Sequence, residues 1–166
     1  RMARHQAMHL SRTAAAALIL VRNEPIEPYI KDYQDRTGTN WARAFGILMA
    51  LGPAAKEAVP VLLSDLESTN DRVRLTAVIL LKSVGLESAE CVAPLIAAFE
   101  DEDSSVRSSA VSALASFGVL AKPAIPLVLS NLSDTNALMR MSALGFILRV
   151  VPPEEFEPLR TLVQHA

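Results

Sequence analysis

The sequence repeats itself every 33 residues, and this period constrains the fold more than any other feature of the chain. Through the centre of the sequence, residues 33 positions apart are identical or chemically similar, and no gap is needed to align them. The matching sets are Gly52, Gly85 and Gly118; Arg74, Arg107 and Arg140; Ala77, Ala110 and Ala143; Leu81, Leu114 and Ile147; and Leu63, Ile96 and Leu129. This agreement indicates stacked copies of one small unit, each burying its apolar face against its neighbours.

Each unit has the pattern of two helices joined by a turn. Apolar residues such as Leu62, Leu63 and Leu66 fall at spacings of three and four, which predicts one buried stripe on a first helix. The polar residues expected to cap the second helices are Asn70, Asp103 and Asn136. A glycine then ends each second helix as its left-handed residue. Prolines early in the first helices, Pro60, Pro94 and Pro126, are expected to bend or restart them.

The register divides the whole chain into one all-α domain, residues 1–166. We expect a degenerate N-terminal helix (1–23), four repeats (24–52, 53–85, 86–118 and 119–151) and an unpaired C-terminal helix (152–166), with about ten helices in all.

Composition and charge exclude several classes of function. The net charge of −2 disfavours a surface built to neutralise phosphates, so we expect no nucleic-acid partner. No unbroken apolar run reaches the ~18–20 residues that a membrane span needs. The longest, Ala14–Val21, has eight residues, so no membrane span is expected.

The first 22 residues admit two interpretations. They carry four arginines and no acid ahead of the apolar run, as a targeting segment does. They also place Leu10, Ala14 and Leu18 on one face of an ordinary first helix, and no small-residue cleavage site follows before Pro25, which favours the helix. The start at Arg1 leaves open whether the chain is a fragment or a processed form. The cytoplasm is the simpler expectation for the compartment, and export from a bacterial cell is the alternative.

The units resemble HEAT repeats. The stretch from Gly52 to Pro60, followed by Leu66, Asn70–Arg74, Ala77 and Gly85, is similar to the short bacterial type that is grouped with phycobilin-lyase-like HEAT repeats. The similarity covers roughly residues 24–164 and recurs three times in register. It implies a right-handed α-solenoid, also called an α–α superhelix, whose second helices line a concave face.

The resemblance also implies a ladder of ion pairs that joins neighbouring units. In the family, an aspartate in each turn pairs with the arginine of a second helix. The matching residues are Asp101 and Asp134 with Arg74, Arg107 and Arg140. The first clear unit departs from this pattern, because Trp41 takes the arginine position and Ser68 replaces an aspartate. We therefore expect the ladder to fail at that end.

The reactive side chains do not assemble into a catalytic or metal site. His5 and His9 share a helix face but lack a third ligand, and His165 lies near the end of the chain, so solvated residues are the simpler interpretation. Cys91 takes the register of Ala58 and Ala124, which favours a buried thiol over a nucleophile. The acidic run Glu100–Asp103 is read as a solvated turn, with a cation or basic-partner site as the alternative. No cofactor or metal is expected.

The candidate partner-binding surface is a strip on the exposed side of the second helices, here called the concave strip. Its residues are Ala42, Gly46, Met49, Leu75, Ile79, Lys82, Ser108, Ser112, Met141, Gly145 and Leu148. They are small or apolar and mostly uncharged, which suits a peptide or helix of another protein. The alternative is that tight helix packing buries several of these side chains.

Three functions remain open. The first is a non-enzymatic module that binds a protein partner through the concave face or the ends, or a scaffold segment of a larger chain or complex. The resemblance also admits a bilin lyase or chaperone-like protein acting on a tetrapyrrole-carrying protein. A HEAT-like DNA glycosylase would need a basic concave face and fits less well.

Overall fold

The computed structural model describes residues 2–156, with the side chains of residues 2–11, Leu138 and Glu154 excluded. Its α-helices are α1 (Met2–Arg22), α2 (Glu27–Gln34), α3 (Trp41–Leu51), α4 (Val59–Asp65), α5 (Asp71–Val84), α6 (Val92–Ala97), α7 (Ser104–Ser116), α8 (Ile125–Ser130) and α9 (Ala137–Val150). Short 3-10 segments are η1 (Gly52–Ala58), η2 (Ala89–Cys91), η3 (Ala98–Glu100), η4 (Gly118–Ala124), η5 (Asn131–Ser133) and η6 (Pro153–Glu155). Most of the expected helix 152–166, with His165, lies outside the described residues.

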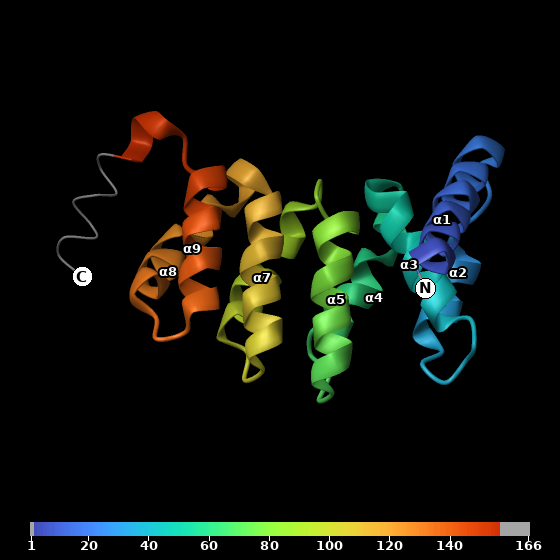
Figure 1. Cartoon of the computed structure of the whole chain (residues 1–166), viewed down its shortest axis with the longest axis horizontal. Coiled ribbons are helices and arrows are strands. Elements are labelled where there is room, and N and C mark those ends of the chain that lie inside the picture. Colours follow the sequence, from blue (N-terminus) through green and yellow to red (C-terminus); the bar gives the residue numbers. More distant parts are fainter. Residues whose placement is uncertain (1, 157–166) are drawn as a thin grey trace.

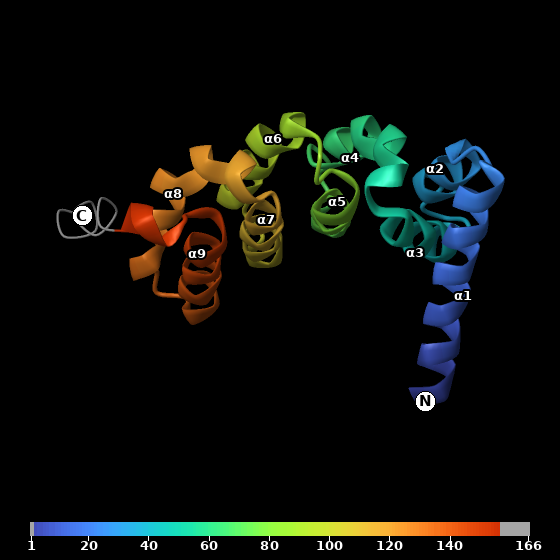
Figure 2. The same ribbon diagram turned by 90° about the horizontal axis from the view of Figure 1, so that it is seen from above.

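The helices form a curved stack of two layers. The second helices α3, α5, α7 and α9 stand side by side in a row; in Figure 1, α5, α7 and α9 face the viewer and α1 lies in front of α3. Seen from above in Figure 2, the first helices α2, α4, α6 and α8 form the outer, convex layer. The all-α solenoid expected from the period is confirmed.

Helix α1 covers the N-terminal end of the stack. It packs against α3 through the buried side chains of Ala16 and Ile19. We expected a degenerate second helix, but Figure 2 shows α1 crossing the row of second helices, with its N-terminus projecting on the concave side.

The local signals that separate the helices act largely as expected. The Asn70 side chain accepts a hydrogen bond from the Arg72 amide, and Asp103 accepts from the Ser105 and Val106 amides, so both cap their helices. Gly52 and Gly118 have φ near +55° and +53°, the left-handed conformation that favours glycine.

Gly85 ends its helix for a different reason. Its φ is −86°, so no left-handed conformation requires glycine there. A Cβ atom would instead lie 2.8 Å from the Cys91 sulfur and 2.9 Å from the Leu81 carbonyl oxygen. The expectation of a left-handed residue was wrong at this position, and close packing is the constraint.

The outer helices are short because their prolines restart them. Pro60 and Pro126 lie in the first turns of α4 and α8, where an amide hydrogen has no helical partner to lose. Pro94 is the third residue of α6. Each of α4, α6 and α8 follows a 3-10 segment, so a bent two-part arm replaces one straight helix.

The interior is one continuous apolar core shared by all the described units. Register mates such as Leu48, Leu81 and Leu114 are fully buried, as are Leu62 and Leu95 from the outer layer. The stretch Trp41–Asp65 has the length and composition that a membrane span needs, but this is weak evidence for one. It is broken at Gly52 into α3 and α4, and nearly half of its apolar window is buried in the core.

The second-helix arginines clasp the turns that precede their own helices. Arg74 donates to the carbonyl of Ser68, 2.9 Å away. Arg107 donates to the carbonyls of Asp101 and Glu102, and Arg140 to those of Asp134 and Thr135, at 2.7–3.0 Å. The clasp is the role that all three arginines share.

Only one rung of the expected ladder joins two units in the described part of the chain. Arg74 donates through Nε and Nη2 to the two carboxylate oxygens of Asp101, at 2.7 and 2.9 Å. The expected pair between Arg107 and Asp134 does not form, and Arg107 donates through Nη1 to the two carbonyls of its own turn.

The first junction uses a different tie. Tyr33 donates a hydrogen bond of 3.0 Å to Asp65, and Arg36 forms an ion pair with the same carboxylate. The Arg36 guanidinium lies 4.1 Å from the centre of the Tyr33 ring, over its face. Trp41 stacks between Tyr33 and Phe45. The ladder fails here as expected, and an aromatic cluster takes its place.

The Arg74–Asp101 rung predicts how stability depends on pH. The Arg74 guanidinium holds the pKa of the Asp101 carboxyl below its ordinary value. A lowered folded-state pKa contributes stability above the unfolded value of about 4, and this contribution is lost as the pH falls through the folded value. Asp101→Asn should therefore lower the urea midpoint of unfolding at pH 7. The difference between the midpoints of the wild type and the variant should become smaller in acid. A constant gap from pH 7 to pH 3 would contradict the rung.

Candidate functional site

The concave strip is accessible over most of its length. Met141 and Leu148 are 71% and 63% exposed, and Ala42, Lys82 and Gly145 are exposed as well. The half-buried members are Met49, Leu75, Ile79, Ser108 and Ser112. Helix packing therefore does not bury this surface as a whole, and partner binding on it stays a prediction.

Gly46 is the exception, and its place in an exposed strip was wrong. The residue is buried, and a Cβ atom there would lie 2.5 Å from Cδ of Arg12. Arg12 belongs to α1, which crosses α3 at this point. The sequence gave no sign of that crossing, because α1 falls outside the clear repeats.

The other glycine of the same register, Gly145, leaves a hollow on the concave side. The hollow has a volume of about 260 Å³ and lies between the second helices, bordered by Lys82, Ser112, Ala115, Ser142, Gly145, Phe146 and Arg149. Lys82 of α5 reaches across to α7 and donates a hydrogen bond of 2.8 Å to the Ser112 hydroxyl. No heavy atom lies within 4 Å of a Cβ built on Gly145, so the floor of the hollow is open.

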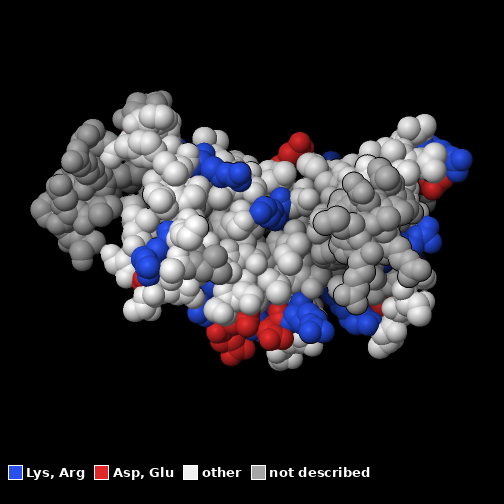
Figure 3. All heavy atoms as spheres, in the orientation of Figure 1, with Lys and Arg blue, Asp and Glu red and all other residues white. Residues whose placement is uncertain are grey.

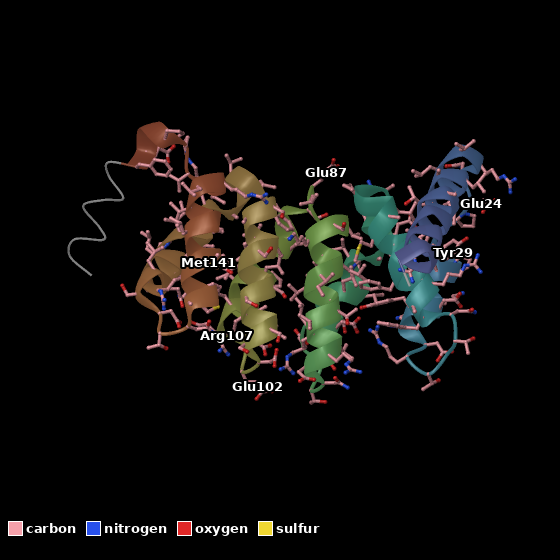
Figure 4. All side chains as sticks on the ribbon, viewed as in Figure 1. Glu24, Tyr29, Glu87, Glu102, Arg107 and Met141 are labelled. Carbon is pink, nitrogen blue, oxygen red and sulfur yellow. The ribbon has the colours of Figure 1, made fainter. Side chains whose placement is uncertain are left out.

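Most of the inner layer is uncharged on this side of the molecule. Figure 3 shows the faces of α5, α7 and α9 with a few basic side chains on them, and acidic and basic side chains together along the lower edge. Figure 4 places Glu102 and Arg107 at that edge, in the turn region, and Met141 on α9 well inside the face. The concave strip is thus a mostly uncharged band, with Lys82 on it, beside a charged rim.

The acidic run at the rim is a structured turn. Asp101 pairs with Arg74 and accepts the Asp103 amide hydrogen, while Asp103 caps α7. Glu102 is exposed and adds a second contact to Arg74. These contacts support the turn interpretation over a cation site. Within the described residues, no three His, Cys, Asp or Glu side chains converge as metal ligands; His5 and His9 fall outside the described side chains.

Cys91 is fully buried beneath Gly85. Burial, followed by the nearby Glu90 carboxylate, raises the pKa of its thiol to about 11. The thiol is therefore protonated at neutral pH and unsuited to nucleophilic attack. The position is a packing position, as its register with two alanines indicated.

A second hollow, here called the Trp41 pocket, was not found from the sequence. It has a volume of about 350 Å³ and is lined by Arg36, Trp41, Asn70, Arg72, Val73 and Thr76. Its signal in the sequence was that Trp41 and Ser68 replace the arginine and the aspartate of the repeat. From the sequence, these replacements indicated only a missing rung of the ladder. A wider hollow of about 690 Å³ between α4 and α6 is lined mainly by small and apolar side chains, with Glu67 and Asp101 at its edge.

Comparisons with known proteins agree with this geometry. A profile of HEAT repeats matches residues 36–115 and 59–147, which together cover 112 of the 166 residues. None of the curated proteins compared with the chain matches it. Among the solved structures, 21 chains match. One is an engineered protein determined by a structural genomics consortium, with a TM-score of 0.61 and 18% identity over 83% of this chain. This chain spans 66% of that protein, and at such identity the likeness concerns the fold alone.

The open floor at Gly145 can be tested by stability. A glycine inside a helix costs about 1 kcal/mol relative to alanine, and no atom near Gly145 opposes a methyl group. Gly145→Ala should therefore raise the free energy of unfolding in urea by about 1 kcal/mol. Gly85→Ala is the matched control and should destabilise, because its methyl group would collide with Cys91. A loss of stability in Gly145→Ala would mean that the floor is filled.

The buried thiol predicts slow modification. Because the pKa of Cys91 is raised to about 11, a disulfide reagent at pH 8 should react roughly a hundredfold more slowly with the folded protein than with the urea-unfolded chain. Cys91 is the one cysteine of the chain, so the released thiolate reports on it alone. Comparable rates in the two states would show that the thiol is accessible.

Proposed function

The chain belongs to the HEAT-repeat family, and on this basis we propose that it is a non-enzymatic module that binds a protein partner along its concave strip. One observation carries the proposal: the strip is an accessible, largely uncharged band on the inner layer of a curved stack. Exposed apolar side chains that lie together on one face of a protein are typical of a surface that binds a partner.

The shape and chemistry of the strip favour a helix or an extended peptide as the bound segment. Exposed apolar residues on α9, Met141 and Leu148, can pack against the apolar face of such a segment. The open hollow at Gly145 lies beside them and can receive one protruding side chain. Lys82 and Arg149 border the hollow, so an acidic or hydrogen-bond-accepting side chain suits it best.

The buried state of the one thiol supports the non-enzymatic part of the proposal. Cys91 is enclosed by the core and protonated at neutral pH, so it offers neither a nucleophile nor an attachment point.

Site-specific photo-crosslinking tests the proposal. A photoreactive amino acid replaces Ser112 on the inner layer, and in a matched variant it replaces Ala89, an exposed residue of η2 in the outer layer. After irradiation in an extract of the source cells, mass spectrometry should identify a protein captured from position 112 and not from position 89. Equal capture from both positions would contradict a specific concave site.

The captured protein then allows a quantitative check. Gly145→Glu fills the hollow without a clash inside the chain and should weaken binding at least about tenfold, which corresponds to about 1.4 kcal/mol. Ala89→Glu adds the same charge to the outer layer and should leave affinity unchanged. An unaltered affinity in Gly145→Glu would move the binding surface elsewhere.

A further inference from the structure

The Trp41 pocket contains two buried hydrogen-bond donors without acceptors. Arg36 Nη1 and Trp41 Nε1 are shielded from solvent, and no described atom accepts a hydrogen bond from either. Both residues line the same hollow of about 350 Å³. A buried donor without an acceptor is unfavourable, so the binding of an acceptor in this pocket would be favourable.

The orphan donors are held rigidly. Arg36 forms its ion pair with Asp65 through Nη2 and lies over the Tyr33 ring, which fixes the guanidinium and leaves Nη1 unused. Trp41 stacks between Tyr33 and Phe45, so the indole N–H cannot turn to another acceptor without breaking this stack. A site whose donors are already oriented loses little entropy when a ligand binds.

The next junction between units shows which chemical group occupies the corresponding position there. One period later, the position of Trp41 is occupied by Arg74, and the carboxylate of Asp101 accepts two hydrogen bonds from it. At the first junction the position of that aspartate is Ser68. Its hydroxyl accepts the Asn70 amide hydrogen, as Asp101 does for Asp103, but it supplies no carboxylate to the neighbouring unit.

We propose that the Trp41 pocket binds the carboxylate of a small apolar acid or of a peptide, which takes the place of the missing aspartate between the two units. The carboxylate accepts hydrogen bonds from Arg36 Nη1 and Trp41 Nε1. Arg72, an exposed cation at the rim, adds a third favourable contact. Trp41 and Val73 form apolar walls for the body of the ligand, and the volume suits a small molecule or one side chain.

The acids nearest to the pocket are already engaged. Asp65 is held by Arg36 and the Tyr33 hydroxyl, and Asp71 accepts the amide hydrogen of Arg72. Their charges are thus partly offset before a ligand arrives. This proposal is independent of the concave strip, since none of the lining residues belongs to that surface.

The test uses Trp41 itself, because it is the one tryptophan of the chain. The full chain, in a buffer free of carboxylates, is titrated with isovalerate and separately with isovaleramide, the neutral amide of the same shape. We expect a saturable change in Trp41 emission with isovalerate and none with the amide. A pentapeptide ending in leucine, with a free or an amidated C-terminus, distinguishes a peptide source from a free small acid by which carboxylate binds more tightly.

Two arginine variants decide whether the signal comes from the pocket. Arg72→Gln removes the rim cation and should weaken isovalerate binding about tenfold, the size of one lost charge-assisted hydrogen bond. Arg43→Gln removes an exposed cation of α3 that lines none of the hollows described above, and it should leave binding unchanged. Circular dichroism and a urea titration check that both variants are folded.

The contradicting outcomes are distinct. Equal responses to isovalerate and isovaleramide, or no saturable response, would mean that water alone satisfies the orphan donors. Equal weakening of isovalerate binding by Arg72→Gln and Arg43→Gln would mean that general charge attraction, and not the pocket, causes the response. Each of these results overturns the proposal, whether or not the concave strip binds a protein.

Discussion

The clasp between the arginines of α5, α7 and α9 and the turns before these helices is the interaction on which this part of the stack depends. A turn between two helices exposes backbone carbonyls with no helical partner, and the guanidinium satisfies one or two of them at once. This fixes where the second helix begins relative to the first. Because the same clasp recurs every 33 residues, these second helices lie side by side, and their solvent-facing sides form one continuous concave surface.

The clasp leaves donors of the guanidinium available for a tie to the next unit, but it does not require one. A guanidinium has five donors, so Arg74 can hold the Ser68 carbonyl and still present a fork to Asp101. Arg107 places one nitrogen on two carbonyls of its own turn and makes no contact with Asp134. The apolar contacts between α7 and α9 therefore join those units without an ion pair. In the described stack, one buried rung, the tie from Tyr33 and Arg36 to Asp65 and a continuous core join the units.

Local signals were enough to predict the fold, because each acts within a few residues. Asn70 and Asp103 cap the helices expected, Gly52 and Gly118 adopt the left-handed conformation, and the period places the core. The errors concern contacts between elements distant in sequence. The crossing of α1 over Gly46, the contact of Gly85 with Cys91 and the tie from Arg36 to Asp65 depend on three-dimensional packing that periodicity does not encode. The Trp41 pocket belongs to this class, since the sequence showed a broken pattern but not the two donors that it leaves unpaired.

One register position of the second helices is buried inside the stack and exposed on α9. Val78 and Val111 are fully buried, because the second helix of the following unit covers each of them. Leu144 occupies the same register in α9 and is 53% exposed. Its neighbours on that face, Met141 and Leu148, are more exposed still. The apolar character of this register position therefore follows from the repeat itself, because stacking normally buries it. Met141 and Leu148 belong instead to the concave strip, where Ser108 and Lys82 share their registers, so the exposed apolar residues of α9 have two origins. Only those of the concave strip, which lie with Lys82 and Gly145 around the hollow, bear on the choice of a partner.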